Sequence, residues 1–160
     1  MKRAHGFTLI ELAIAISLMA MLAALALPAL ISTVNNARSR SMIQKLMGDF
    51  VWARNSAATA ASATSGTVAT FTVNADCSWS TTVGGVANTA HSLDSTSLGQ
   101  LAPGLSCTAG SGNTLPLTFN FTPQGFVAPS STLTYTTNRG QSWVLQVLTS
   151  GSMLLTNGAS

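Results

Sequence analysis

The sequence GFTLIE at residues 6–11 follows a short basic leader and opens an apolar run, residues 7–31, in which Glu11 is the only charge. As a helix that rises about 1.5 Å per residue, this run is long enough to cross a hydrocarbon core of roughly 30 Å. Basic residues favour the cytoplasmic side of a span, so the leader is expected to stay cytoplasmic and the remainder to be exported. The run therefore predicts one membrane-spanning helix near the N-terminus.

The best-marked cleavage junction lies before the apolar run, at Gly6-Phe7, whereas an ordinary secretory signal is cut after its apolar region. The leader of residues 1–6, the Gly6-Phe7 junction, Glu11 shortly after it and Pro28 near the far end of the run together resemble the type IV prepilin signature. The resemblance implies that a prepilin peptidase cuts after Gly6 and methylates the new amine of Phe7. It also implies that the helix remains as a membrane anchor and later as the core of a filament. Pro28 lacks a backbone N–H and is expected to kink this helix.

Glu11 needs an explanation, because a carboxylate within a membrane span costs about 2.5–3.5 kcal/mol on insertion scales. One interpretation places Glu11 close enough to the interface to be hydrated. The other, which we favour, pairs it with the N-terminal amine of Phe7 on a neighbouring subunit. Such a pair neutralises two charges that an apolar filament core could not hold singly. Glu11 is therefore the predicted assembly residue.

The remainder of the chain is poor in charge. The 160 residues leave about 130 after the span, which suits one modest domain. Without residues 1–6 the chain keeps five Lys and Arg against four Asp and Glu, and after Asn55 the only charged residues are Asp76, Asp94 and Arg139. Because duplex DNA is held largely by cations on its phosphates, we expect DNA to be bound weakly or not at all.

The helical pattern continues past the membrane span. Apolar residues recur at spacings of three and four, as on an amphipathic helix; they are Ile43, Leu46, Met47, Phe50, Ala53 and Ala57. One helix is predicted from Phe7 to about Ala61, with residues 7–31 in the membrane and residues 32–61 as the amphipathic half. Residues 62–66 are expected to end it.

Two further features of this helix are predicted to lie outside the core. Arg38, Arg40 and Lys45 form a basic collar, for which a solvated helix face near lipid head groups or neighbouring subunits is expected. Trp52 falls beside the apolar stripe and is predicted to lie at the edge of the core.

After Gly66 the period changes to two, as expected for β-strands rich in β-branched and aromatic residues. The predicted strands are Thr67–Val73, Cys77–Val83, Leu115–Phe121, Gly125–Ala128, Thr132–Thr137, Ser142–Leu148 and Ser152–Thr156. Residues 88–99 are predicted to form a polar loop. The fold class is therefore α+β, with one long N-terminal helix packed on an antiparallel β domain, residues 62–160.

This downstream part is similar to the GspH/FimT/FimU-type minor pilins and pseudopilins. The similarity rests on the helix segment MGDFVWARNSA at residues 47–57, the turn FTPQG at residues 121–125, and the ending from Arg139 to Gly151. It implies a type IV pilin-like fold. Major pilins usually carry their cysteines near the C-terminus, so the central Cys77 and Cys107 favour a minor subunit.

Cys77 and Cys107 lie in the part predicted to be exported, where an oxidising compartment would permit one disulfide between them. Two buried free thiols are the alternative. A metal site is not expected, because His91 is the only exported histidine and no carboxylate cluster accompanies it. His91 is predicted to be solvent-exposed in a polar loop. Neither a nucleophile elbow nor a phosphate-binding loop is present, so we predict no catalytic residues, no cofactor and no enzymatic activity.

Three functions fit these observations. The favoured one is a minor type IV pilin, a structural subunit that helps to initiate or cap pilus assembly. The others are a type II secretion pseudopilin and a DNA-capturing minor pilin of natural transformation, although the basic C-terminal tail of DNA-binding relatives is missing after Gly151. The expected partners are major and minor pilin subunits, a prepilin peptidase, an inner-membrane assembly platform and, before assembly, membrane lipid. The expected location is the inner membrane, single-pass with a periplasmic β domain, and then the pilus or pseudopilus.

Overall fold

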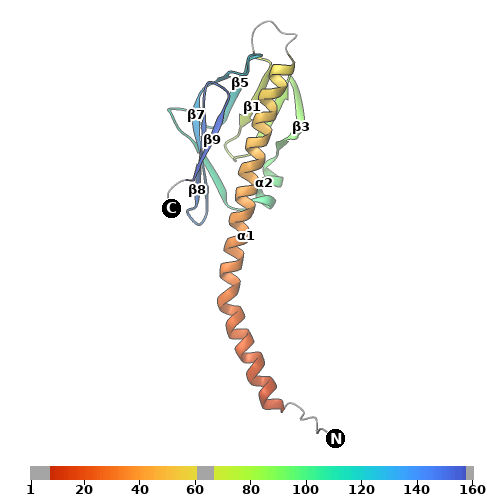
Figure 1. The fold of residues 1–160 in the computed structure, drawn as a ribbon, viewed down its shortest axis with the longest axis vertical. Helices are drawn as coiled ribbons and strands as arrows, with labels where there is room; N and C mark the ends of the chain where they lie inside the picture. The colour runs from red at the N-terminus through yellow and green to blue at the C-terminus, as the bar shows by residue number, and fades with distance from the viewer. Residues whose placement is uncertain (1–7, 61–66, 158–160) are drawn as a thin grey trace. The chain divides into compact units, whose positions relative to one another are not determined.

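The computed structural model describes residues 8–60 and 67–157 of the chain. The chain divides into two compact units, Met1–Asn35 and Asn36–Ser160. The long helix α1, Leu9–Thr59, contributes to both units (Figure 1). The predicted helix is thus confirmed over Leu9–Thr59, while the predicted end residues Phe7 and Ala61 lie outside the described residues.

Two antiparallel sheets form the β part of the second unit. The five-stranded sheet has the order β3-β2-β1-β5-β6, and the four-stranded sheet has the order β4-β7-β8-β9. The strands of the first sheet are β1 (Ala69–Val73), β2 (Trp79–Val83), β3 (Val86–Leu93), β5 (Leu117–Phe121) and β6 (Val127–Ala128). Those of the second are β4 (Leu105–Ala109), β7 (Ser131–Thr137), β8 (Ser142–Val147) and β9 (Met153–Asn157). An α+β pilin-like arrangement, one long helix followed by an antiparallel β domain, is therefore present.

The core of the second unit forms around the amphipathic half of α1. The predicted stripe is confirmed, because Ile43, Leu46, Phe50, Ala53 and Ala57 are fully buried and Met47 is partly buried. The Phe50 ring makes edge-on contacts with Phe71 of β1 and with Phe119 and Phe121 of β5, at centroid distances of 4.9–5.6 Å. Such edge-on pairs add about 0.5–1.5 kcal/mol each beyond area burial. Phe50 thus fixes α1 against the centre of the first sheet.

Strand alternation explains which aromatic residues are buried. Along β7 and β8 every second side chain is buried, which places Tyr135 and Trp143 directly opposite each other on the inner face. Burial raises the pKa of the Tyr135 hydroxyl, since the phenolate would lose its water. Tyr135 and Trp143 therefore belong to the core.

The predicted polar loop at residues 88–99 is wrong. Residues of this segment form most of β3 and the short helix α2, Ser95–Leu101, and β4 follows where no strand was predicted. Asp94 caps α2, because its side chain accepts hydrogen bonds of 2.8 Å from both the backbone N–H and the hydroxyl of Ser97. These bonds hold the pKa of Asp94 below its usual value. Asp94 therefore marks the start of α2, a helix that was not predicted from the sequence.

Candidate functional site

The first candidate site is the N-terminal turn of α1, which carries Glu11, the predicted assembly residue. Thr8 precedes the helix, and its backbone N–H and hydroxyl donate to Glu11 Oε2 at 3.2 and 3.1 Å. In return, the Glu11 N–H donates to the Thr8 hydroxyl at 3.3 Å. This reciprocal arrangement is a capping box, with Thr8 as N-cap and Glu11 three residues on. The T-x-x-E spacing of Thr8 and Glu11 is present in the sequence, although a capping box was not predicted from it.

The structure places the other N-terminal residues only in part. Gly6 and Phe7, the predicted cleavage and methylation residues, lie outside the described residues. Pro28 lies within α1, and the kink assigned to it stays a prediction. The proposed pairing of Glu11 with the amine of Phe7 on a neighbouring subunit likewise stays a prediction.

The N-terminal part of α1 is apolar and exposed. Within the described residues, α1 is the one helix long and apolar enough to cross a membrane, and its most apolar window has a mean hydropathy of 2.5 and no buried residue. Its leucine, isoleucine and methionine side chains from Leu9 to Leu27 are all more than half exposed. Exposed apolar surface of this extent marks a membrane or protein interaction site.

A buried carboxylate, Asp49, holds the β2–β3 hairpin on α1. Asp49 Oδ2 accepts hydrogen bonds from Lys45 Nζ at 2.8 Å and from Trp79 Nε1 at 2.9 Å. Asp49 Oδ1 lies 3.0 Å from His91 Nδ1, and the His91 ring stacks on Trp52 at a centroid distance of 3.9 Å. These five residues are called the Asp49 cluster.

The Asp49 cluster corrects one prediction and refines two others. His91 was expected to be solvent-exposed, but it is half-buried between Asp49 and Trp52, because β3 carries it onto the helix. Lys45 belongs to the predicted solvated collar, yet its ammonium group is paired with the buried Asp49. Trp52 is confirmed at the edge of the core, packed partly buried against it.

The disulfide between Cys77 and Cys107 joins the two sheets. Cys77 lies in the β1–β2 turn at a φ of 70°, and Cys107 lies on β4, with Cα atoms 5.6 Å apart. The turn is ordered by Asp76, whose side chain accepts hydrogen bonds from the hydroxyl and the N–H of Ser78 at 2.6 and 3.0 Å. The hydroxyl bond first, and the N–H bond with it, lower the pKa of Asp76. The predicted disulfide is thus confirmed and the free-thiol alternative is not.

Replacing both cysteines, as Cys77→Ala/Cys107→Ala, is expected to lower the free energy of unfolding by about 3–4 kcal/mol. The reason is that the bridge closes a loop with a sequence separation of 30 and thereby restricts the unfolded chain. Urea titration followed by tryptophan fluorescence measures the loss, and the wild type under reducing conditions should match the variant. A loss below about 1 kcal/mol in both would contradict the chain-entropy account.

Arg54 brings two distant turns together. The Arg54 Nε–H donates to the carbonyl oxygen of Gly125 at 3.2 Å, and Gly151 is packed against the same carbonyl and the same side chain. Val127 N–H, just after the first turn, donates to the carbonyl oxygen of Thr149 at 3.0 Å. The two turns belong to different sheets, so this contact holds the sheets together at a second place besides the disulfide.

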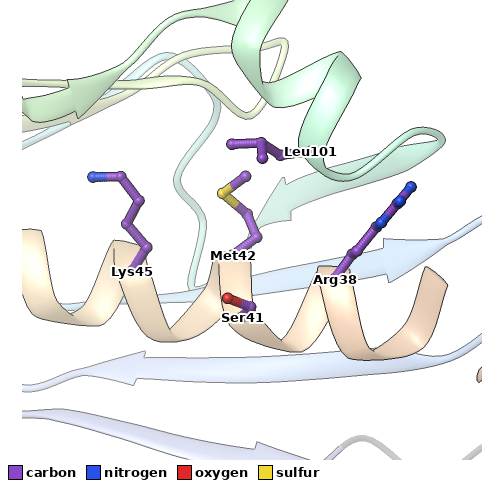
Figure 2. Close-up of a pocket in the computed structure, with 5 residues that line it drawn as sticks. All are labelled: Arg38, Ser41, Met42, Lys45 and Leu101. Carbon is purple, nitrogen blue, oxygen red and sulfur yellow. The ribbon is translucent and has the colours of Figure 1, made fainter. Parts of the chain in front are cut away.

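A shallow cleft of about 130 Å³ lies between α1 and α2. Figure 2 shows Met42 reaching toward Leu101, with Arg38 and Lys45 pointing away to either side. Since Lys45 is already paired with Asp49, the cleft has an apolar floor and one remaining cation, Arg38. Among residues 8–60 and 67–157, no group of three or more His, Cys, Asp or Glu could hold a metal ion.

The comparisons with known proteins bear on the N-terminal segment. A family model described as the prokaryotic N-terminal methylation motif matches residues 1–27. No curated protein and no solved structure matches the chain. The motif implies processing by a prepilin peptidase and assembly with other pilins, and it points to a structural subunit rather than an enzyme. A membrane-anchoring helix fits this picture. The type IV prepilin-like motif therefore supports a type IV pilin-family protein.

Proposed function

We propose that the chain is a minor type IV pilin, a structural subunit that helps to initiate or cap pilus assembly. The observation that carries the proposal is the N-terminal turn, in which Glu11 stands within the matched methylation motif at the start of an exposed apolar helix. The capping box uses Glu11 Oε2, and no hydrogen bond to Oε1 was found in the described part of the chain. The Glu11 carboxylate is the group that we propose to pair with a neighbour's amine.

Two observations support the minor role over the main filament component. The disulfide lies at the centre of the domain, between the β1–β2 turn and β4, rather than at the C-terminus as in most major pilins. The helix segment, the β5–β6 turn and the C-terminal turn that resemble the GspH/FimT/FimU-type subunits meet around Arg54. A type II secretion pseudopilin would share these features. Detection of the chain in sheared pili, rather than in a secretion pseudopilus, would distinguish a pilin from a pseudopilin.

Processing gives the first test. We expect the mature chain to begin at Phe7 with a methylated amine, because Gly6-Phe7 precedes the apolar run and lies within the residues that match the methylation motif. Mass spectrometry of the N-terminal peptide from membranes measures it, with a strain that lacks the prepilin peptidase as control. A mature chain that begins after the apolar run would show signal-peptidase cleavage and exclude the pilin assignment.

Incorporation gives the second test. Glu11→Leu and Glu11→Gln are both expected to insert in the membrane but to be reduced at least tenfold in sheared filaments, since neither presents a charge to a neighbour's amine. The amount in membrane and filament fractions is measured by quantitative immunoblotting.

The glutamine variant separates the two roles of Glu11, because glutamine can replace glutamate in a capping box. If capping alone mattered, Glu11→Gln would assemble normally while Glu11→Leu failed. That result would contradict the charge-pair proposal while leaving the cleavage prediction untouched.

A further inference from the structure

Two arginines of α1, Arg38 and Arg40, are exposed and form no ion pair with any of the described residues. The salt bridges in this part of the chain all involve Asp49 and include neither arginine. Arg38 and Arg40 stand seven and nine residues after Ile31, the last residue of the predicted span, in the same helix. They are therefore unpaired cations close to the place where α1 is expected to leave the membrane.

The place of these cations opposes the predicted orientation of the chain. With the leader on the cytoplasmic side, as predicted, Arg38 and Arg40 follow the span on the opposite side of the membrane. Basic residues favour the cytoplasmic side, so cations near the far end of a span weaken the charge difference that sets its orientation. An anionic partner at the far surface would offset this cost.

The geometry of α1 favours a position of the two guanidinium groups near lipid headgroups. Seven residues of helix rise about 10 Å, and the headgroup region is roughly 5–8 Å thick on each side of the hydrocarbon core. Side chains on a helix point back toward its N-terminus, so Arg38 and Arg40 extend from α1 toward the span. Their long side chains can thus reach phosphate groups at the surface of a bilayer.

The directions of the two arginines favour lipid over a protein partner. Residues two apart on an α-helix are separated by about 200° around its axis, so Arg38 and Arg40 leave α1 on nearly opposite sides. One carboxylate of a neighbouring protein could not meet both, whereas lipid headgroups surround a spanning helix. A second copy of this chain also offers few carboxylates after the span, because Asp49 is buried, and Asp76 and Asp94 accept hydrogen bonds from serine hydroxyls.

We propose that Arg38 and Arg40 bind the headgroups of anionic phospholipids at the far surface of the membrane. A guanidinium group is planar and donates paired hydrogen bonds to phosphate oxygens. A zwitterionic headgroup carries the same phosphate, but its own ammonium group neutralises it, so an anionic headgroup is preferred. The contact rests on the membrane-anchored state of the proposed function, and it has to be released when a subunit leaves the membrane for a filament.

Lipid retention by the full-length chain tests the proposal. The chain is reconstituted in nanodiscs of phosphatidylcholine with a minority of phosphatidylglycerol, and native mass spectrometry counts the lipids that each chain retains. All versions carry Lys2→Gln/Arg3→Gln, so that these leader cations do not bind lipid at the other surface. The ratio of retained phosphatidylglycerol to phosphatidylcholine is expected to fall at least fivefold in Arg38→Gln/Arg40→Gln, since each cation near the surface contributes a factor of about five.

A variant of equal net charge separates the position of the cations from their number. Arg38→Gln/Arg40→Gln/Val51→Arg/Asn55→Arg moves both cations to exposed positions of α1 at least 20 residues after Ile31. These positions lie at least about 30 Å of helix beyond the span, so the lipid ratio should stay as low as in the glutamine variant. Arg38→Lys/Arg40→Lys keeps the charges in place and should retain most of the preference for phosphatidylglycerol.

Three results would overturn this proposal and leave the proposed function untouched. The chain with both arginines could retain the two lipids in proportion to their amounts in the nanodisc. The glutamine variant could keep the preference, which would assign the arginines to another partner, such as a carboxylate of a neighbouring subunit. The variant with displaced cations could recover the preference, which would show that net charge alone attracts the lipid. A chain that does not enter the bilayer would contradict the proposed function as well.

Discussion

Asp49→Ala is expected to lower the free energy of unfolding by about 2–4 kcal/mol, because the buried Trp79 N–H loses its charged acceptor and Lys45 and His91 lose the carboxylate that they contact. The Asp49 side chain is 8% exposed, and it accepts hydrogen bonds from Lys45 and Trp79 while it lies against His91. Without it, the buried Trp79 N–H loses its acceptor and two potential cations lose their carboxylate. The β2–β3 hairpin then loses its polar attachment to α1.

Urea titration of the full chain in micelles, followed by tryptophan fluorescence, measures this loss. Asp76→Ala is the matched control, because it also removes an aspartate, but one that is exposed and that, in the described part of the chain, accepts its hydrogen bonds from Ser78. Its cost should stay below about 1 kcal/mol, as is usual for surface polar groups. Equal losses in the two variants would show that the Asp49 cluster does not hold the hairpin.

The sequence predicted best those elements that bury one regular face against the rest of the domain. The helical stripe from Ile43 to Ala57 is found buried as predicted, because its spacing alone specifies which side of α1 faces the sheets. The alternating strands β7 and β8 were found for the same reason. Hydrophobic periodicity arises when one face of an element is buried and the other is exposed, so it predicts only elements of that kind.

The missed elements lack such a pattern. Strand β3 is an edge strand in which four of the eight residues are exposed and only Leu93 is buried, so VANTAHSL shows no clear alternation. Helix α2 has a single buried residue, Leu98, and is identified mainly by its Asp94 cap. Local capping chemistry, rather than hydrophobic periodicity, was the available signal at both α2 and the Thr8–Glu11 turn.

The missed side-chain contacts join residues far apart in the chain. Asp49 is separated by 30 residues from Trp79 and by 42 from His91, and Arg54 by 71 from Gly125. Asp49 stands beside the apolar stripe in the sequence, but its burial and its partners depend on β3 returning to α1. Such pairs depend on the strand topology. Because residues 88–99 were predicted to form a loop, His91 was predicted to be exposed and no contact with Asp49 was expected.

The contact around Arg54 gives the second large expected effect. Gly151→Ala is expected to lower the free energy of unfolding by about 3–5 kcal/mol, the sum of backbone strain and overpacking. Gly151 has a φ of +74°, where a side chain is strained, and it is buried. A Cβ there would overlap the carbonyl oxygen of Gly125 and lie 2.8 Å from Arg54 Nε. Relieving the overlap requires the two turns to separate, which breaks the contact between the sheets.

Gly140→Ala separates the two causes, because Gly140 has a φ of +83° but no atom within 4 Å of an added Cβ. This control should cost only about 1–2 kcal/mol, the backbone strain alone. Adding Arg54→Ala to Gly151→Ala should not restore stability, since the obstructing carbonyl of Gly125 belongs to the backbone and stays in place. Chemical unfolding of the three variants measures these differences. Recovery in the double variant would instead identify the Arg54 side chain as the obstacle, and equal losses at Gly140 and Gly151 would leave backbone strain as the whole effect.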